Sequence, residues 1–413
     1  MISFILRKIG YGLLVLWGVV TLVFFLFNLA PGDPVRNLVG ENASEEVVTN
    51  MRRKFDLDLT LGRRYALYLN DLSPLAVHSN QEQSRIFFKP SEYTGIRIGS
   101  SGEGKAIYLK TPYLKRSLLT DKSVSGILSE VLPGTVVLAV VSIGLALIVG
   151  LLLGIAAALK KDGFYDRMIL FISALGMAGP SFFVAILVAW LGAVVWREQI
   201  AVSYGALFIL ISAITAFYLF EKTKRAMVWS IPLLAIVLFI ANVFPMRVEA
   251  ILLPGTGLNM TGSLYSVDVW RGEFLDLQNL ILPVVTLMIR PLSVIVQLTR
   301  SSLLDVMQQD YIRTARAKGL SEWEVIFRHA LRNALNPVIT AVSGWFASLL
   351  AGAIFVEFVF GWKGLGQQMF TAIENQDMPV VMGGVIVISA AFVLINILVD
   401  LLYAWIDPRV RLS

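Results

Sequence analysis

The sequence predicts an all-α polytopic membrane protein, because it is strongly apolar and divides into long apolar runs joined by polar loops. Of its 413 residues, 56% are hydrophobic and only 15% are charged, and the mean hydropathy is +0.72. Soluble globular chains carry about 25% charged residues, so much of this apolar surface must face a lipid bilayer. The net charge of +6 is scattered among loops between apolar runs, which does not indicate a nucleic-acid partner.

Eight stretches are apolar and long enough to cross a bilayer, which takes about 20 residues. The two between 201 and 246 are separated only by EKTKR, so we expect them to form a helical hairpin. The first is longer than the apolar region of a cleaved signal peptide and lacks a small-residue cleavage site, so we expect it to be retained as a span. The eight stretches are approximately 9–30, 127–159, 168–195, 201–220, 228–246, 281–299, 337–357 and 380–403.

The basic residues predict which side of the membrane each loop faces. If the chain crosses the membrane eight times, every basic group lies on the same side. The positive-inside rule identifies that side as the cytoplasm. Both termini are then expected in the cytoplasm. The basic groups are Arg7 and Lys8; Lys160, Lys161 and Arg167; Lys222, Lys224 and Arg225; the residues from Arg300 to Arg332; and Arg409 with Arg411.

Two longer segments, 31–126 and 247–280, are then expected outside. Long loops cross the membrane largely regardless of their charge, so the basic residues of 31–126 do not contradict this orientation. After a capping signal at Ser44 its spacing is helical, and further on QSRIFFKP, GIRIG and GKAIYLK are typical of short strands. We expect a small outer α/β subdomain. The segment 247–280 is rich in glycine and carries acidic residues.

A polar segment of the chain, 310–337, lies between two long apolar runs and is basic in its first half. After Gly319 the spacing of one apolar helix face begins. We therefore expect two short amphipathic helices joined at the glycine, lying on the membrane surface with one side free for a partner. The residues that share the apolar face are Trp323, Ile326, Phe327, Ala330 and Ala334.

One charged residue, Arg290, lies near the middle of the 281–299 stretch. An arginine at the bilayer centre costs about 2.5–3.5 kcal/mol on insertion scales, so it normally faces protein or a water-filled cavity. Pro291 beside it lacks a backbone donor and can kink the helix. Either Arg290 lines a translocation path and attracts an anionic group on the cargo, or it pairs with a carboxylate or helix-end carbonyl of a neighbouring subunit.

Three patterns that suggest enzymatic or metal chemistry fail on inspection. GSSGEGKA, residues 99–106, nearly spells a phosphate-binding loop, but Ala106 stands where a hydroxyl should bind Mg²⁺ and no buried strand precedes it. A turn is expected there.

In GMAGPS, residues 176–181, a serine nucleophile would need an activating base, and no predicted span contains histidine. A Gly/Pro-broken helix lining a cavity is the better expectation. Cysteine is absent and the two histidines are far apart, so we expect no metal site.

The polar segment resembles the cytoplasmic coupling loop of binding-protein-dependent ABC importer permeases, and its matching residues are Asp310, Ala315, Ala317, Gly319 and Pro337. EFVFGWKGLG, which begins at Glu357, resembles the same family's outer-vestibule segment, with loop geometry alone as the alternative. PGDP at 31–34 matches the turn after the family's first span. Taken together, the chain resembles a permease of the dipeptide/oligopeptide/nickel class of bacterial ABC importers, over about 1–70, 113–195 and 281–413.

The resemblance implies a type I ABC importer permease body of six spans. The eight spans expected here are then six plus an inserted hairpin, and extra outer sequence at 75–112 is a second departure from the family. The expected parts are a first span at 1–30, an outer segment at 31–126, permease spans two and three at 127–195, the hairpin at 196–246, an outer loop at 247–280, and a permease core at 281–413 with the coupling loop at 301–336.

The implied function is import of peptides, or of nickel or another small solute, across the bacterial inner membrane by alternating access. The implied partners are a second homologous permease, two cytoplasmic ATPases that bind ATP and Mg²⁺, and an outer substrate-binding protein. This chain would bind no cofactor. ATPase coupling is assigned to Asp310, Arg313, Ala315, Arg316, Ala317, Gly319, Glu322 and Pro337, and the translocation path to Arg290, Pro291 and Glu357.

Two classes of function compete with this interpretation. A membrane-embedded enzyme or scaffold without ATPase coupling would need polar catalytic pairs within the spans, where the sequence offers only Arg290 centrally. A channel would not need the large basic segment. The sequence does not identify the cargo.

Overall fold

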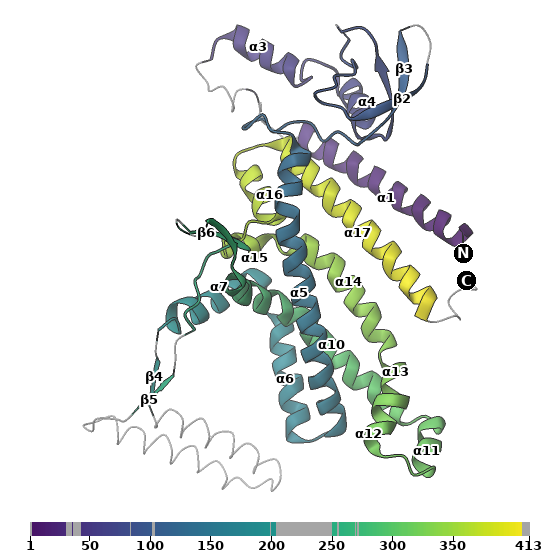
Figure 1. Cartoon of the computed structure of the whole chain (residues 1–413), viewed down its shortest axis with the longest axis vertical. Coiled ribbons are helices and arrows are strands. Elements are labelled where there is room, and N and C mark those ends of the chain that lie inside the picture. The colour runs from purple at the N-terminus through teal and green to yellow at the C-terminus, as the bar shows by residue number, and fades with distance from the viewer. Residues whose placement is uncertain are drawn as a thin grey trace. The chain divides into compact units, whose positions relative to one another are not determined.

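The chain forms two compact units in the computed structural model (Figure 1), the first made of Met1–Thr135 with Gly364–Ser413 and the second of Val136–Lys363. Helices dominate both. The structure describes residues 2–29, 35, 43–82, 84–100, 104–198, 200–203, 250–253, 256–268, 270 and 272–406.

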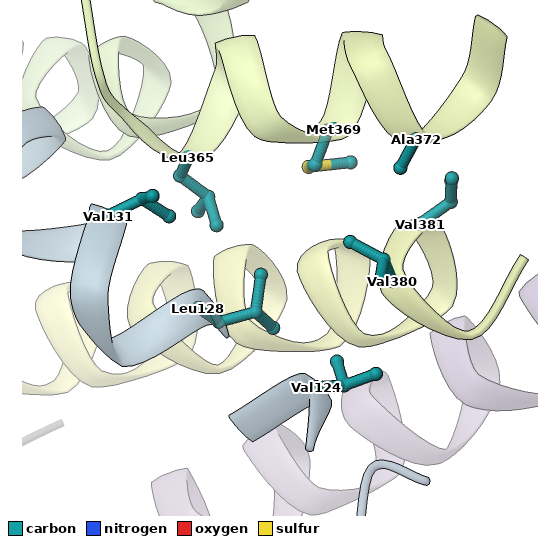
Figure 2. Packing of buried hydrophobic residues seen from close by; sticks show 8 residues of the cluster. All are labelled: Val124, Leu128, Val131, Leu365, Met369, Ala372, Val380 and Val381. Atoms are coloured by element: carbon teal, nitrogen blue, oxygen red, sulfur yellow. The ribbon is translucent and has the colours of Figure 1, made fainter. Parts of the chain in front are cut away.

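Two long helices, α1 (Ile2–Leu29) and α17 (Met378–Ile406), lie side by side in the first unit (Figure 1). The beginning of α5 (Val124–Leu159) and the short helix α16 (Leu365–Glu374) pack against α17. Figure 2 shows how their side chains meet in one apolar cluster. Its members are Val124, Leu128 and Val131 of α5, Leu365, Met369 and Ala372 of α16, and Val380 and Val381 of α17.

A small α/β subdomain follows α1 in the same unit, as predicted. Helix α3 (Glu45–Lys54) begins at Ser44, whose side chain accepts a hydrogen bond from the Val47 backbone N–H, and α4 (Leu61–Leu72) follows. Three antiparallel strands form a sheet in the order β1-β3-β2. The strands are β1 (Leu75–Ser79), β2 (Gly95–Ser100) and β3 (Lys105–Lys110).

Two of the three predicted strands are confirmed, in GIRIG and GKAIYLK, but the prediction for QSRIFFKP is wrong. That segment meets the sheet only through an isolated bridge between Phe87 and Ser79. Its aromatic side chains fill the core instead, since Phe88 stacks on Tyr108 with ring centroids 4.2 Å apart. LAVHS takes the strand position. Because Lys105 begins a strand, GSSGEGKA also lacks the helix that a phosphate-binding loop requires.

Helix α10 (Ile281–Met307) is the central element of the second unit. It packs against α5, α6 (Phe164–Ala178), α7 (Ser181–Ala189) and α14 (Asn336–Gly352). Glycines let α5 approach closely, because a Cβ added at Gly150 would lie 2.6 Å from the Ile295 side chain. The same addition at Gly154 would lie 2.6 Å from Thr299. Small residues commonly permit such close helix contacts in membrane proteins.

Four of the predicted spans are confirmed as single helices long and apolar enough to cross a membrane. These helices are Leu6–Asn28, Val124–Leu159, Leu277–Met307 and Met378–Val399. They correspond to the predicted stretches 9–30, 127–159, 281–299 and 380–403.

The stretch 168–195, predicted as one span with a Gly/Pro break, is formed by two helices. It consists of Phe164–Ala178 and Ser181–Val195, which are bent by 108° at the break between them. Gly179 and Pro180 both have extended backbone at the break, and Pro180 supplies no backbone donor to continue the helix. The Gly/Pro break predicted in GMAGPS is thus present. The second helix ends in the π-helical turn η1 (Trp190–Val195).

The predicted span 337–357 is also interrupted. Helix α14 has 17 residues and ends at Gly352, and a separate short helix, α15 (Ile354–Val359), follows. The run is therefore divided at Ala353, and Glu357 lies within the second helix with its side chain fully buried.

The predicted hairpin at 201–246 lies almost wholly outside the described residues, so the count of eight spans stays a prediction. Its start is corrected, because β4 (Ile200–Ser203) is a strand. This strand pairs antiparallel with β5 (Ala250–Leu253), which brings the two ends of the segment together. The outer loop forms a second hairpin, β6 (Tyr265–Asp268) with β7 (Gly272–Leu275), before the 3₁₀ turn η3 (Leu277–Leu280).

A buried ion pair joins α6 to α10. The Arg300 Nε and Nη2 atoms donate to Asp166 Oδ1 and Oδ2 at 2.5 Å and 2.6 Å. The Asp162 backbone N–H donates to Asp166 Oδ2 at 2.8 Å. Asp166 is only 1% exposed, so its charge depends on these donors for compensation.

We expect Asp166→Asn to destabilise the protein by roughly 3 kcal/mol, because it leaves Arg300 without its charged partner in a buried site. The measurement is the unfolding temperature in detergent. Asp162→Asn is the matched control, since Asp162 is exposed and has φ of 59°, a conformation that asparagine tolerates. Equal destabilisation by the two substitutions would contradict the importance of the pair.

Candidate functional site

The polar segment 310–337 forms two short helices joined at a glycine, as predicted. The first helix, α11, is Asp310–Ala317. The chain then turns at Gly319, whose φ of 78° is in the left-handed region that favours glycine. The second helix comprises α12 (Glu322–Glu324), the π-helical turn η4 (Val325–Ala330) and α13 (Leu331–Ala334). We call residues 310–335 the two-helix segment.

A capping box starts the second helix. The Ser321 hydroxyl accepts a hydrogen bond from the Glu324 backbone N–H at 3.3 Å. Glu324 Oε2 in turn accepts from the Ser321 backbone N–H at 3.1 Å and from its hydroxyl at 2.9 Å. The backbone hydrogen bond from Ser321, followed by the hydroxyl, lowers the pKa of the Glu324 carboxyl. The carboxylate therefore stays ionised at the helix N-terminus, where the helix dipole favours negative charge.

Polar contacts also link the two helices across the turn. Arg316 Nε and Nη2 donate to the two carboxylate oxygens of Glu322 at 2.9 Å and 3.2 Å, and Asn333 Nδ2 donates to the Tyr311 hydroxyl at 2.7 Å. These side chains are exposed. Exposed ion pairs contribute only about 0.2–1 kcal/mol, so the arrangement depends mainly on its buried face.

The buried face of the two-helix segment packs onto the ends of α5 and α10. One apolar cluster joins the three elements, and the residues that α5 and α10 contribute are at least nine-tenths buried. The segment is thus attached to both long helices by a continuous core. The cluster consists of Ile155 and Ala158 of α5, Leu303 of α10, and Ile312, Ala315, Val325, Ala330 and Ala334 of the segment.

The predicted apolar face is only partly right. Ile326, Ala330 and Ala334 are buried, but Trp323 and Phe327 are 66% and 49% exposed. The difference falls at the π-helical turn, whose wider repeat departs from the regular helix spacing that the prediction assumed; Val325 is buried there instead. Trp323 and Phe327 stack against each other with ring centroids 5.3 Å apart. They therefore present an apolar surface to the surroundings.

The remaining predicted coupling residues lie mostly on the open side of the segment. Ala315 is buried in the core, and Pro337 lies in the first turn of α14, as predicted for a residue that opens a span. The exposed ones are Asp310, Arg313, Arg316, Ala317, Gly319 and Glu322.

Arg290 lies inside α10, which continues as a helix through the buried Pro291. The Arg290 side chain is half-buried. Within the described ranges it has no hydrogen-bond or ion-pair partner. The structure thus does not join Arg290 to any other predicted site residue.

Glu357 is fully buried, and the Trp362 backbone N–H donates to its carbonyl at 2.8 Å. Of the three glycines in EFVFGWKGLG, only Gly361 has a positive φ, of 58°. Gly364 has ordinary extended backbone before α16, and Gly366 lies within that helix.

The sequence analysis missed the Asp166–Arg300 pair and the exposure of the Trp323–Phe327 pair. An acidic residue in the first turn of an apolar stretch was a signal for Asp166, whereas no sequence signal marks the π-helical turn. In the part of the chain that the structure describes, no group of three or more His, Cys, Asp or Glu side chains could hold a metal ion.

Comparisons with known proteins point in one direction. Residues 226–412 match the family described as binding-protein-dependent transport system inner membrane component, and residues 1–84 match the N-terminal family of the same membrane components. The chain is 33% identical over 407 residues to the probable D,D-dipeptide transport system permease protein DdpB of Escherichia coli, covering 98% of this chain and 97% of that one. It is 30% identical over 413 residues to the di/tripeptide transport system permease protein DppB of Pseudomonas aeruginosa, covering 100% and 99%.

We expect Gly319→Val to loosen the two-helix segment, because a β-branched residue in the left-handed region costs at least about 1–2 kcal/mol. The cost is conformational, since nothing lies within 4 Å of a Cβ added there. Faster amide hydrogen exchange across 310–335 would report it. Gly319→Asn is the matched control, because asparagine tolerates this conformation. Unchanged exchange in the valine variant would contradict the need for glycine.

Proposed function

Since this chain belongs to the family of binding-protein-dependent transport system inner membrane components, we propose that it is the permease subunit of an ABC importer of short peptides. Members of the family are transport components and not enzymes. The relatives described above are named as peptide permeases, which favours peptide cargo over nickel. They offer no support for the competing scaffold or enzyme.

The family description itself includes a binding protein, and we propose the rest of the assembly with it. A second homologous permease would pair with this chain so that cargo passes between the two. Two cytoplasmic ATPases would bind ATP and Mg²⁺, and this chain would bind neither. A substrate-binding protein would deliver peptide from the outer side, where we place the α/β subdomain and the 247–280 loop.

The observation that carries the proposed coupling mechanism is the two-sided construction of the two-helix segment. One side is fixed to the ends of α5 and α10 by Ile312, Ala315 and Val325. The other side is exposed and carries the Arg316–Glu322 pair and the stacked Trp323 and Phe327. A partner bound to the exposed side would therefore displace α5 and α10 when it moves, since a close-packed core transmits displacement.

In the proposed cycle, the ATPases close on ATP and move the two coupling segments toward each other. The attached spans then tilt from an inward-facing to an outward-facing arrangement, a rigid-body transition of the kind common in coupled proteins. We assign the translocation path to Arg290, Pro291 and Glu357. Arg290 has the best support, because it is half-buried and lacks a partner among the described residues.

We place the two-helix segment and both termini in the cytoplasm of a bacterium, with the chain spanning its inner membrane several times. Lys318 tests this orientation, because it is exposed at the end of α11. Labelling with a membrane-impermeant amine reagent should modify Lys318 in inverted vesicles and not in intact cells. Modification only from outside the cell would overturn the proposal.

We expect replacement of Trp323 and Phe327 by serine to reduce ATPase binding at least ten-fold, since burial of a large aromatic side chain contributes about 1.5–3 kcal/mol. The measurement is the amount of ATPase that co-purifies with the chain in detergent. Trp270→Ser is the control, because Trp270 is also highly exposed, at 93%, but lies in the 247–280 loop. Peptide uptake by the wild-type chain without any ATPase would sink the proposed function.

A further inference from the structure

We infer that Arg290 binds the terminal carboxylate of the transported peptide. This inference rests on the proposed transport of peptides and names the chemical group that the path recognises. Arg290 is the only charged residue between 281 and 299. Its guanidinium is half-buried and has no hydrogen-bond or ion-pair partner in the described part of the chain.

The same helix contains a second arginine, and its guanidinium does have a partner. Arg300 lies ten residues further along α10 and is bound by both oxygens of the buried Asp166. At 1.5 Å per residue the two are separated by about 15 Å along the helix axis. The chain thus compensates the Arg300 guanidinium with its own carboxylate, whereas Arg290 has no such partner among the described residues.

The helix face around Arg290 carries polar residues and packs in part on α6, since a Cβ added at Gly176 would lie 2.6 Å from the buried Ser293 hydroxyl. Thr286, Ser293 and Gln297 lie four before, three after and seven after Arg290, which places them on its side of the helix. On the opposite side, Ile295 and Thr299 meet Gly150 and Gly154 of α5. The polar face is therefore not the face that holds α10 to α5.

The polar neighbours of Arg290 do not bind its guanidinium, which can therefore donate to an anion. The Thr286 and Ser293 hydroxyls donate to the backbone carbonyls of Leu282 and Ile289 at 2.9 Å and 2.8 Å. Gln297 Nε2 has only the sulfur of Met177 at 3.5 Å, a weak acceptor. None of these groups carries a negative charge that could neutralise Arg290.

A carboxylate is the anion that fits this site. The planar guanidinium can donate two parallel hydrogen bonds to its two oxygens, and every unmodified linear peptide carries a C-terminal carboxylate whatever its side chains. A hydrogen bond to a charged group contributes about 1.5–3 kcal/mol. An interaction of this strength is sufficient to select the free acid over its amide. It is also weak enough for the peptide to be released.

The test compares uptake of alanyl-alanine with uptake of its C-terminal amide by the complete transporter in proteoliposomes, with the same binding protein throughout. We expect Arg290→Gln to lower the ratio of free acid to amide about ten-fold, with amide uptake unchanged. Arg290→Lys keeps the charge but not the paired donors, so its ratio should lie between those of wild type and Arg290→Gln. Arg300→Gln is the second control: it leaves the buried Asp166 without its partner, so it should lower uptake of acid and amide equally and leave the ratio unchanged.

Several results would overturn the inference. A ratio unchanged in both Arg290 variants, or equal loss of uptake for acid and amide, would show that Arg290 does not select the carboxylate. Loss of the second permease from the purified Arg290→Gln complex would assign Arg290 to subunit pairing instead. If the wild type takes up neither peptide, the proposed peptide transport fails together with the inference, whereas normal uptake with an unaltered ratio removes the inference alone.

Discussion

The close contact between α10 and α5 is the constraint on which the second unit depends. Gly150 and Gly154 leave no room for a side chain against Ile295 and Thr299, so the two helices cannot slide past each other without a steric clash. The cluster around Leu303 then joins the two-helix segment to both helices at once. In the proposed coupling mechanism, a force on the segment would therefore act on both helices together.

The two arginines of α10 differ in whether the chain itself pairs them. Arg300 is fixed to Asp166 of α6 near the two-helix segment, and this ion pair links a third helix to α5 and α10. Arg290, further from the segment, has no such attachment among the described residues. One arginine thus holds helices together, and under the proposed function the other is available to the cargo.

Hydropathy alone predicted the four long spanning helices, because a long apolar run in a membrane has few alternatives to a helix. It did not predict where backbone chemistry interrupts such a run. The bend at Gly179 and Pro180 was predicted from the Gly/Pro motif and not from hydropathy, and the break at Ala353 was not predicted at all. In the α/β subdomain, QSRIFFKP has strand-like composition, but it contributes the Phe88 side chain, which stacks on Tyr108, instead of a strand.

The two-helix segment shows the same limit of sequence-based prediction at the scale of one helical turn. Its glycine joint could be predicted, because few residues other than glycine adopt φ of 78° at low cost. The orientation of Trp323 and Phe327 could not, because periodicity assumes 3.6 residues in every turn, and the π-helical turn at 325–330 breaks that assumption. One irregular turn thereby has two effects, since it places Val325 in the core that anchors the segment and turns two aromatic rings toward the side where a partner would bind. A regular helix with this sequence would bury the rings and leave the exposed side almost entirely polar.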